Sequence, residues 1–274
     1  MKTFALALGA GGARSLAQVA VIEALDEMGV RPVAIAGSSF GALIGAAYAA
    51  GMTGKATRRH VIALAHDRGG IVARLVAARA APLAQWIAAP LGNPMLLDAA
   101  KFCGAFMPPA VPDDFASLTI PLKIVATDLH GRCEIVLTAG ALKAAVAASM
   151  AIPGLIRPVE IDGRVMVDGA AVNPLPFDLL RGLADVVLAV DCSGGPDETV
   201  GMPNPWAAMF TTVAIMGQSI VAEKLKSGGP DLIIHPNVRI FGVLDFFQAS
   251  AILRAAEPAK AEVKRLLGEL IGLP

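Results

Sequence analysis

The stretch PVAIAGSSFGALIGAAYAAG, residues Pro32–Gly51, predicts a strand, a tight turn and a helix in direct succession. Pro32–Ala36 is short and apolar, as expected of a buried strand, and Ser39–Ala50 is rich in Ala and Gly, as expected of a buried helix. The turn GSSFG at positions 37–41 matches G-x-S-x-G, in which the middle serine is a nucleophile held in a strained strand-to-helix turn. Ser39 is therefore the candidate nucleophile and Ser38 the variable position, with a simple helix cap as the alternative role of Ser39.

Another strand and helix precede this stretch. Phe4–Leu8 is a short apolar run, Leu16–Met28 has apolar residues at helical spacing, and the glycine-rich loop GAGGAR lies between them at positions 9–14. Right-handed crossovers would place both strands in one parallel sheet. The loop fits a dinucleotide site poorly, because Arg14 stands at its sixth position and the next strand offers no acid for a ribose. An oxyanion hole and a plain tight turn are the two other interpretations.

Strands and helices alternate along most of the remaining chain. We expect helices at 55–80, 96–106, 141–150, 206–226 and 244–270, and strands at 122–127, 133–137, 158–161, 165–167, 186–192 and 232–235. This alternation predicts an α/β fold in three layers. The chain shows no internal repeat or linker, so we expect a single domain over 1–274, with the proline-rich segment 82–121 as a lid or cover insertion.

The composition narrows the classes of partner. Lys plus Arg and Asp plus Glu each number 23, so the net charge is zero and nucleic acid is not an expected partner. The three cysteines form no C-x-x-C pair, and no Asp/His cluster has ligand spacing, so no metal site is expected. Hydrophobic residues make up 55% of the chain, and the mean hydropathy is +0.62. A dense alanine-rich core is one explanation, and apolar surface that meets lipid or another subunit is the other.

Three stretches raise the question of a membrane. The apolar run near the N-terminus is short for a signal peptide, which favours a cytoplasmic location. Pro32–Gly54 and Thr199–Ala222 carry no charged residue, but both fit buried or interfacial helices better than membrane spans.

Two residues compete as the acceptor of the Ser39 proton. His235 ends an apolar strand late in the chain, and the order Ser39, Asp168, His235 matches the triad of α/β-hydrolases. In that fold, however, the strand-to-helix turn that holds the nucleophile, called the nucleophile elbow, follows several strands. Here Ser39 follows the second strand. Asp168 ends an apolar strand and precedes Gly169, so its carboxylate could take the proton directly if burial raises its pKa. An ordinary Asp-Gly turn is the alternative.

Three segments, in this order, resemble the patatin-like phospholipases, specifically the smaller bacterial members. They are GAGGAR at 9–14, GSSFG at 37–41 and ASMAIPGLIRPVEIDGRVMVDGAAVNPLP at 148–176, and the resemblance spans roughly residues 3–192. It implies a three-layer α/β/α patatin-like fold with a mainly parallel central sheet. It also implies a Ser–Asp dyad without histidine, in which Ser39 is the nucleophile and Asp168 is the base.

The resemblance assigns further roles in the site. It implies that the N–H groups of Gly11 and Gly12, joined by that of Phe40, stabilise the oxyanion. Arg14 is expected to support the glycine-rich loop, with a substrate phosphate as its alternative partner. The chain departs from the usual G-G-G-x-R-G loop at Ala10 and Ser15, which leaves a catalytically impaired lipid-binding protein as an alternative. The motif glycines are Gly9, Gly37, Gly41 and Gly169.

The function implied is that of a lipid acyl hydrolase of the phospholipase A, lysophospholipase or esterase type. The expected partner is a phospholipid, a lysophospholipid or another fatty-acyl ester, and no cofactor is implied. An acyltransferase or a thioesterase could use the same dyad, since only the acceptor or the ester differs. Peripheral contact with the inner face of the membrane is also expected.

Two apolar segments are candidates for that lipid contact. One is Pro82–Pro112, with Trp86, Phe102, Phe106 and Met107, and the other is the helix from Trp206, with Met209, Val213, Ile215 and Met216. Basic residues near the first could favour anionic headgroups. Core packing, or pairing of two subunits in a homodimer, is the alternative role.

Overall fold

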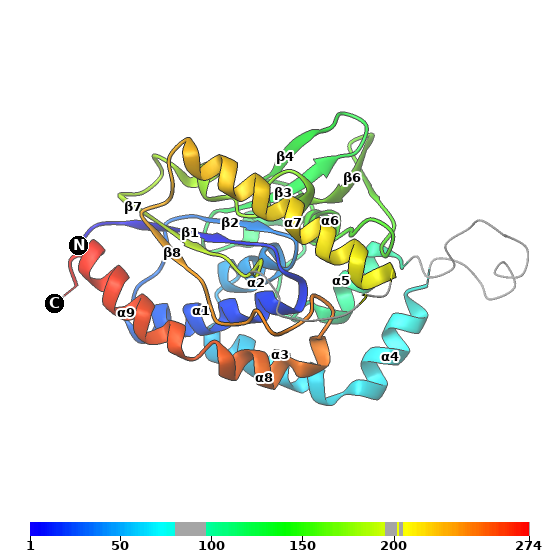
Figure 1. Cartoon of the computed structure of the whole chain (residues 1–274), viewed down its shortest axis with the longest axis horizontal. Helices are drawn as coiled ribbons and strands as arrows, with labels where there is room; N and C mark the ends of the chain where they lie inside the picture. The colour runs from blue at the N-terminus through cyan, green and yellow to red at the C-terminus, as the bar shows by residue number, and fades with distance from the viewer. Residues whose placement is uncertain (80–96, 195–201, 203–204, 274) are drawn as a thin grey trace, which may run out of the picture.

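The computed structural model describes residues 1–79, 97–194, 202 and 205–273, and Figure 1 shows one sheet covered by helices. Within these ranges the sheet has eight strands in the order β5-β6-β3-β2-β1-β7-β8, and β4 pairs with β3 beside this path. The strands are β1 (Phe4–Leu8), β2 (Ile35–Ser38), β3 (Leu122–Asp128), β4 (Cys133–Leu137), β5 (Val159–Ile161), β6 (Arg164–Asp168), β7 (Val186–Val190) and β8 (Leu232–Ile234). The predicted α/β class is confirmed.

The middle of the sheet is parallel. β1 pairs in parallel with β2 and β7, β2 with β3, and β7 with β8. At one side β4 and β6 run antiparallel to β3, and β5 runs antiparallel to β6. All five residues of β1 are buried, as expected of a central strand covered on both faces. The carboxyl ends of the parallel strands share one edge, where open α/β sheets bind their ligands.

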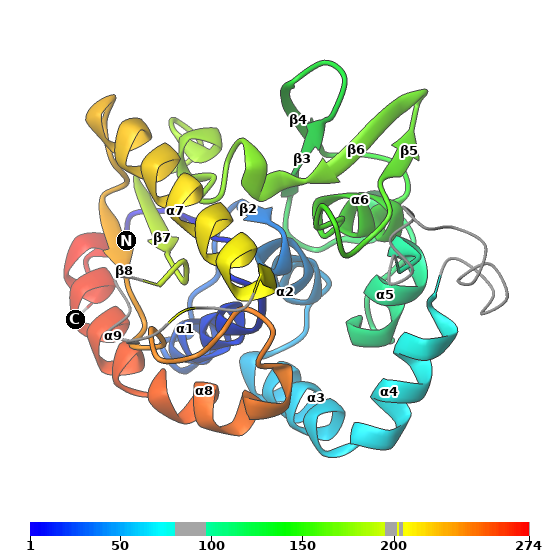
Figure 2. The same cartoon turned by 45° about the vertical axis from the view of Figure 1, so that its right-hand side comes forward.

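Helices form a layer on each face of the sheet. They are η1 (Gly12–Ala17), α1 (Gln18–Glu27), α2 (Phe40–Ala49), α3 (Gly54–His66), α4 (Arg68–Ala77), α5 (Ala99–Phe106), η3 (Phe115–Ser117), α6 (Leu142–Ser149), η4 (Gly169–Ala171), η5 (Phe177–Leu180), α7 (Pro205–Lys226), η6 (Phe246–Gln248), α8 (Ala249–Ala255) and α9 (Pro258–Ile271). Leu6 and Leu8 of β1 pack in a large core with α1, α2 and α9, whereas Ala5 and Ala7 pack with Phe177 and α7. Figures 1 and 2 show α1 and α9 on one face and α7 crossing the other.

Some predicted boundaries are wrong. The stretch 55–80 is not one helix, because α3 ends and α4 begins at Asp67, whose carboxylate accepts the Gly70 N–H at 3.0 Å. The stretch 244–270 is divided into η6, α8 and α9, and α9 begins at Pro258. Proline lacks the N–H that a continuous helix needs and suits the first position of a new one. The second strand lies later than predicted, because its pairing with β1 starts at Ile35.

The structure describes only residues 97–121 of the proline-rich segment 82–121. Residues 80–96, with Trp86, lie outside the described residues, so the lid stays a prediction. The described part contains α5, which packs against α4 and α6. Phe102, Phe106 and Met107 are buried. These three residues therefore belong to the core, and the lipid-contact role predicted for them is wrong.

The two uncharged stretches are parts of the globular fold. Pro32–Gly54 supplies β2 and α2, whose residues are all buried. Residues 205–222 of the second stretch lie in α7. Among the helices of the described residues, none combines the length and the apolar character that a membrane span requires.

An ionic cluster joins α1, α3 and α9. Glu23 is 2% exposed, accepts two hydrogen bonds of 2.7 Å from Arg58 and pairs with Lys260. Arg58 also donates to Glu257 Oε1 at 2.5 Å. Burial acts to raise the pKa of Glu23, but the hydrogen bonds from Arg58 and Lys260 outweigh it, so this pKa lies below its ordinary value. Through Arg58 and Lys260, the Glu23 carboxylate of α1 therefore links this helix to α3 and α9.

The two ends of the described chain lie together. The Lys2 N–H donates to the Ile271 carbonyl oxygen at 2.9 Å, and the marks for the two termini are neighbours in Figure 1. Lys2 leads into the amino end of β1. The ends of the chain are thus at the edge of the sheet opposite to the carboxyl ends of its parallel strands.

Candidate active site

Ser39 lies at the junction between β2 and α2. Its φ is 54° and its ψ is −129°, a combination that non-glycine residues adopt only when the surrounding structure enforces it. Ser39 is 4% exposed, and its N–H donates to Ser149 Oγ at 2.9 Å. The strained turn expected of a nucleophile elbow is therefore present at the second serine of GSSFG.

Glycines make this turn sterically feasible. A Cβ at Gly37 would lie 2.7 Å from the Cα of Ala42, and a Cβ at Gly41 would collide with the carbonyl oxygen of Leu8. A Cβ at Gly169 would collide in the same way with the carbonyl oxygen of Val125. These backbones approach so closely that a side chain at any of the three glycines would displace the elbow or the strand beside it.

Asp168 ends β6 and faces the elbow. Its Oδ2 accepts a hydrogen bond from Ser39 Oγ at 2.7 Å, and its Oδ1 accepts one from the Ala170 N–H at 2.8 Å. Thr127 Oγ1 donates to the Asp168 carbonyl oxygen at 2.8 Å and fixes the end of the strand. Burial raises the pKa of Asp168 to about 6, and the hydrogen bonds from Ala170 and Ser39 oppose the rise. A carboxylate with this pKa is a stronger base than an exposed one.

The glycine-rich loop follows β1 and lies next to the elbow. Gly12 has a φ of 58°, and the neighbouring Ala13 N–H donates to the Val243 carbonyl oxygen at 2.8 Å. A Cβ at Gly9 would lie 2.9 Å from Leu175 Cδ1, and one at Gly11 would lie 2.7 Å from the Cys192 carbonyl oxygen. The loop is thus held between the segments that follow β7 and β8.

Three backbone donors of this region are unoccupied. No hydrogen bond among the described residues uses the N–H groups of Gly11, Gly12 or Phe40. Ala10, in contrast, donates its N–H to the Pro174 carbonyl oxygen at 2.8 Å. Its methyl group is accommodated, so this departure from the family loop leaves the loop folded. Unpaired N–H groups at the starts of η1 and α2 suit a developing negative charge.

Ser15, the second departure from the family loop, and Gln18 both donate hydrogen bonds to the loop. Ser15 Oγ donates to the Gly9 carbonyl oxygen at 3.4 Å, and Gln18 Nε2 donates to the same oxygen at 2.6 Å. Both side chains are buried. Nothing in the sequence motif signals these contacts. Polar residues one and four positions after Arg14 are the available clue, because the first turns of a helix can reach back to the preceding loop.

Arg14 is 8% exposed and is buried under the segment that follows β7. A Cβ at Gly194 would collide with its guanidinium group, and among the described residues its Nε has no hydrogen-bond partner. Burial lowers the pKa of Arg14, whereas the nearby Cys192 and Asp191 act to raise it. The packing of Arg14 against Gly194 favours the loop-supporting role over contact with a substrate phosphate.

None of the four histidines, all of which lie in the described residues, forms a hydrogen bond with Ser39 or Asp168. His235 is exposed, and its Nδ1 lies 3.6 Å from Asp191 Oδ2. His60 Nε2 lies 2.9 Å from the Phe106 carbonyl oxygen, and His66 Nδ1 lies 2.8 Å from that of Ile62. In the described ranges no group of three or more His, Cys, Asp or Glu side chains could hold a metal ion. Among the described residues, Asp168 is the titratable side chain that accepts a hydrogen bond from Ser39 Oγ.

The sequence compares directly with a known family. The model of the family described as patatin-like phospholipase matches residues 6–181. The chain belongs to this family. The matched residues include the whole candidate site, because the glycine-rich loop, the elbow and Asp168 all lie within them.

Relatives of this patatin-like chain include bacterial and mammalian proteins. It is 38% identical over 191 residues to an uncharacterized NTE family protein of Mycobacterium tuberculosis, covering 69% of this chain and 49% of that protein. It is 32% identical over 203 residues to the patatin-like phospholipase domain-containing protein 7 of Rattus norvegicus, covering 71% of this chain and 14% of the relative. The chain thus spans about half the length of the mycobacterial relative. Among solved structures, VipD from Legionella pneumophila matches with a TM-score of 0.49 and 14% identity over 96% of this chain and 66% of VipD.

Proposed function

We propose that this patatin-like protein is a serine lipid acyl hydrolase that uses Ser39 and Asp168 as its catalytic dyad. The observation that carries the proposal is the 2.7 Å hydrogen bond from Ser39 Oγ to Asp168 Oδ2 inside a strained elbow. Family membership supports the hydrolytic reaction class. The raised pKa of Asp168 supports its role as the base.

In the first half-reaction Ser39 Oγ forms a bond to the ester carbonyl carbon while its proton passes to Asp168. The carbonyl oxygen becomes an oxyanion, which accepts hydrogen bonds from the N–H groups of Gly11, Gly12 and Phe40. The carbon–oxygen bond to the alcohol then breaks, and Asp168 returns the proton to the leaving oxygen. Water attacks the acyl-enzyme in the second half-reaction, gives a proton to Asp168 and releases the fatty acid, and the proton returns to Ser39.

Family membership supports a fatty-acyl ester as the substrate. A phospholipid, a lysophospholipid or another fatty-acyl ester would present the carbonyl carbon that this site attacks. Transfer of the acyl group to an acceptor other than water, and cleavage of a thioester, would proceed through the same acyl-enzyme. Mass spectrometry of the products from a phospholipid and from an acyl thioester distinguishes these reactions, because hydrolysis releases free fatty acid and transfer does not.

The dyad is tested with three single variants and a fluorophosphonate, which labels an activated serine. We expect the wild type to be labelled and to show a burst of alcohol release from a reactive ester. Ser39→Ala and Asp168→Asn should each lose at least about a thousandfold in kcat, since each removes a group that acts in the transition state. His235→Ala should retain most of the activity. A folded His235→Ala protein as inactive as Ser39→Ala would contradict the dyad and indicate a triad.

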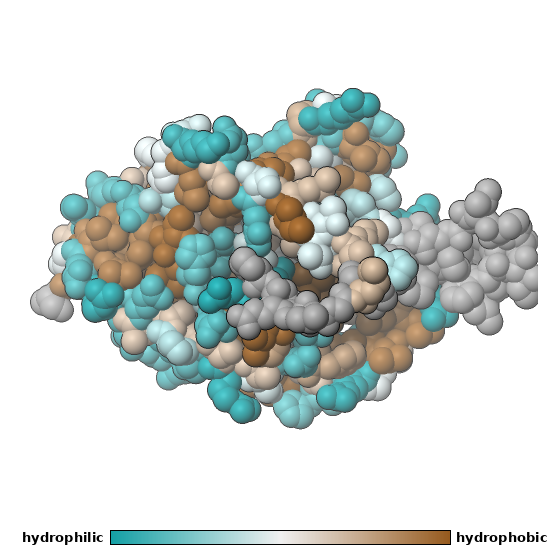
Figure 3. Space-filling view, in the orientation of Figure 1, coloured by the Kyte–Doolittle hydropathy of each residue, from teal (hydrophilic) through white to brown (hydrophobic). Residues whose placement is uncertain are grey.

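The surface above the site suits a substrate that lies in a lipid aggregate. α7 crosses the carboxyl edge of the sheet, where Gly217 approaches Pro174 and Gln218 Nε2 donates to the Gly194 carbonyl oxygen at 3.3 Å. Figure 3 shows hydrophobic groups on this face over α7. In α7, Val213, Ile215 and Met216 are 49%, 57% and 60% exposed. We assign this exposed part of α7 to peripheral lipid contact.

A further inference from the structure

The end of α6 contacts the backbone of both candidate dyad residues. The Ser39 N–H donates to Ser149 Oγ at 2.9 Å, and the Asp168 N–H donates to the Ala151 carbonyl oxygen at 3.0 Å. Ser149 is the last residue of α6, and Ala151 follows shortly after it. Since Ser39 and Asp168 are 129 positions apart, the short segment 149–151 joins two halves of the site that are distant in the chain.

The segment that makes these two contacts is itself held in place. Ser149, Met150 and Ala151 are 0%, 1% and 0% exposed. The Met150 N–H donates to the Val146 carbonyl oxygen at 3.0 Å, and the Ala151 N–H donates to that of Ala148 at 3.2 Å. α6 also packs against α2, β3 and β6, the elements around the dyad. The segment therefore offers hydrogen-bond acceptors whose positions are fixed relative to the sheet.

Ser39 needs a directional contact because its backbone is strained. Its φ of 54° and ψ of −129° persist only where neighbouring groups enforce them. Ser39 is 4% exposed, and a buried N–H without an acceptor would destabilise the turn further. Ser149 Oγ supplies the acceptor and orients the peptide group that carries this N–H. The direction of the Ser39 side chain, and with it the position of Oγ, depends on that orientation.

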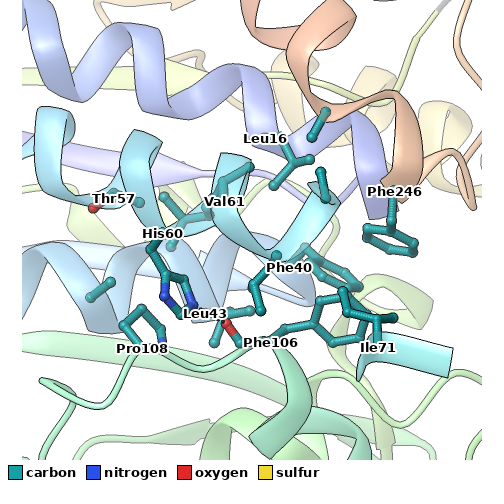
Figure 4. A pocket seen from close by; sticks show the side chains of 15 residues that line it. Leu16, Phe40, Leu43, Thr57, His60, Val61, Ile71, Phe106, Pro108 and Phe246 are labelled. Atoms are coloured by element: carbon teal, nitrogen blue, oxygen red, sulfur yellow. Dashed lines mark hydrogen bonds between the residues drawn. The ribbon is translucent and has the colours of Figure 1, made fainter. Parts of the chain in front are cut away.

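Apolar packing holds the start of α2 without fixing this orientation. Figure 4 shows the side chain of Phe40, the residue after Ser39, in an apolar pocket beside Phe106 and Phe246. The Phe40 ring centroid lies 5.7 Å from that of Phe106 and 4.7 Å from that of Phe246. Hydrophobic contacts are non-directional, so they keep the helix in place but do not orient the Ser39 N–H. The hydrogen bond to Ser149 supplies the directional part of the constraint.

We propose that Ser149 is a positioning residue of the dyad, whose Oγ holds the Ser39 backbone so that Ser39 Oγ stays within hydrogen-bond distance of Asp168. From the same segment, the Ala151 carbonyl oxygen holds the backbone of the base. The proposal rests on the proposed hydrolase function and adds a residue on which its geometry depends. Ser149 acts through Ser39 and takes no part in the transfer of the proton.

The pKa of Asp168 reports on the same geometry. The groups that donate to its carboxylate are the Ser39 hydroxyl and the Ala170 N–H. Burial raises this pKa to about 6, these two hydrogen bonds oppose the rise, and no charged side chain of the described residues contributes to the shift. Loss of the hydrogen bond from Ser39 would therefore raise the pKa further. A substitution that only weakens the fold would leave the pKa of the folded molecules unchanged.

The test compares Ser149→Ala with Thr57→Ala. Thr57 is 2% exposed, and its Oγ1 donates to the Thr53 carbonyl oxygen at 3.1 Å, so the control also loses a buried, hydrogen-bonded hydroxyl. Ser149→Ala should lower kcat and kcat/KM for a soluble ester equally, by about a hundredfold, because the dyad is misplaced and substrate binding is not. Thr57→Ala should keep both values. Thermal unfolding of each variant verifies the fold.

A second variant grades the same contact. Ser149→Cys keeps the approximate size of the side chain but offers a weak acceptor, so it should lower kcat about tenfold. It also carries the test if Ser149→Ala does not fold. Wild-type kcat in either folded Ser149 variant would overturn the proposal, and so would an equal loss of kcat in Thr57→Ala.

NMR titration of the Asp168 carboxyl carbon separates the positioning role from the reaction, because it needs no substrate. The signal is assigned by its absence in Asp168→Asn. Its pKa should be higher in Ser149→Ala than in the wild type and unchanged in Thr57→Ala. If the wild type cleaves no ester but this difference holds, the proposed function fails and the positioning role stands. If esters are cleaved and the pKa is the same in all three proteins, the positioning role is the part that fails.

Discussion

At the residue scale, Ser39 combines three structural properties. It has a positive φ, its side chain donates to a carboxylate, and its N–H is held by Ser149. The backbone strain is compensated by contacts from β6 and α6, so the geometry depends on residues 110 and 129 positions away. The position of the hydroxyl is therefore defined by the whole sheet edge.

The pKa of Asp168 predicts how activity depends on pH. Only the ionised carboxylate accepts the Ser39 proton, so kcat/KM should rise with pH and level off above about 6. The measurement uses a soluble ester from about pH 4.5 to 8, with circular dichroism at each pH to follow the fold. A profile that is flat or falling between pH 5 and 7 would contradict the assignment of Asp168 as the base.

The same pKa predicts a cost to stability. The folded pKa, about 6, lies above the ordinary value of about 3.9, so the folded state binds the proton more tightly. The free energy of unfolding therefore falls as the pH rises between these values. Asp168→Asn has no charge to bury and should be more stable than the wild type above pH 6, by up to about 3 kcal/mol. Urea unfolding at pH 4 and pH 8 measures it, and the gain should be absent at pH 4.

Two glycines provide a matched test of close packing. Gly41→Ala should cost about 3 kcal/mol of stability, because the new Cβ would collide with the backbone of β1. Gly104→Ala, in α5, meets no atom within 4 Å and should stabilise the protein by up to about 1 kcal/mol. Thermal unfolding of both variants is the measurement. Equal midpoints would show that the elbow relaxes to accept a side chain.

The sequence alone could predict the residues with a local signature. Ser39 and its flanking glycines lie in one pentapeptide, and Asp168 lies in a strand-end Asp-Gly pair. Ser149, Gln18 and Thr127 could not be predicted, because their contacts join positions that only the folded sheet brings together. The oxyanion roles of Gly11, Gly12 and Phe40 stay predictions until an anion or inhibitor is seen at these N–H groups.

Among the elements, the ionic cluster at Glu23 links three helices to one buried charge. Glu23→Gln should lower the free energy of unfolding by about 3 kcal/mol, because Arg58 and Lys260 would keep their charges without the carboxylate. Glu262→Gln, an exposed position on α9, is the control and should change it by less than about 0.5 kcal/mol. A Glu23→Gln protein as stable as this control would show that water already screens the cluster.

The helix breaks show where periodicity stops being informative. The apolar spacing of 55–80 continues across Asp67, so a pattern alone predicts one helix, although the carboxylate of Asp67 starts a new one. Pro258 was a visible signal within 244–270, and the helix begins there. Local capping chemistry, not hydrophobic spacing, determines both boundaries.

At the scale of the molecule, the alternation of strands and helices in the sequence was sufficient to predict an α/β fold. The order of the strands in the sheet could not be predicted from this alternation. β7 follows β6 in the chain yet pairs with β1, and β6 pairs with β3. β3 pairs with β2, which leads to Ser39, and with β6, which ends at Asp168. The pairing of strands that are distant in the sequence therefore brings Asp168 beside Ser39.

If α7 contacts lipid, substitutions on its exposed side should weaken binding to vesicles and leave the hydrolysis of a soluble ester unchanged. The double variant Ile215→Ser, Met216→Ser should bind vesicles of neutral and anionic phospholipid about tenfold more weakly in flotation, because two exposed apolar side chains are lost. Hydrolysis of a short soluble ester should be unchanged. Leu183→Ser is the control, as Leu183 is 46% exposed and lies before β7, at the other edge of the sheet.

Two results would contradict lipid contact through α7. One is equal flotation of the double variant and Leu183→Ser. The other is conversion of a dimer to a monomer by the double variant in gel filtration, which would assign this part of α7 to subunit pairing.

The hydrogen bond between Lys2 and Ile271 has a consequence for engineering. Since the first strand and the last helix meet at one corner, a short peptide could bridge them and the chain could be reopened elsewhere, for example in the exposed turn between β5 and β6. Such a circular permutant would keep every strand pairing of the sheet. For the same reason, a fusion partner or a surface tether attached at this corner would orient the catalytic edge outward, toward whatever lipid the experimenter supplies.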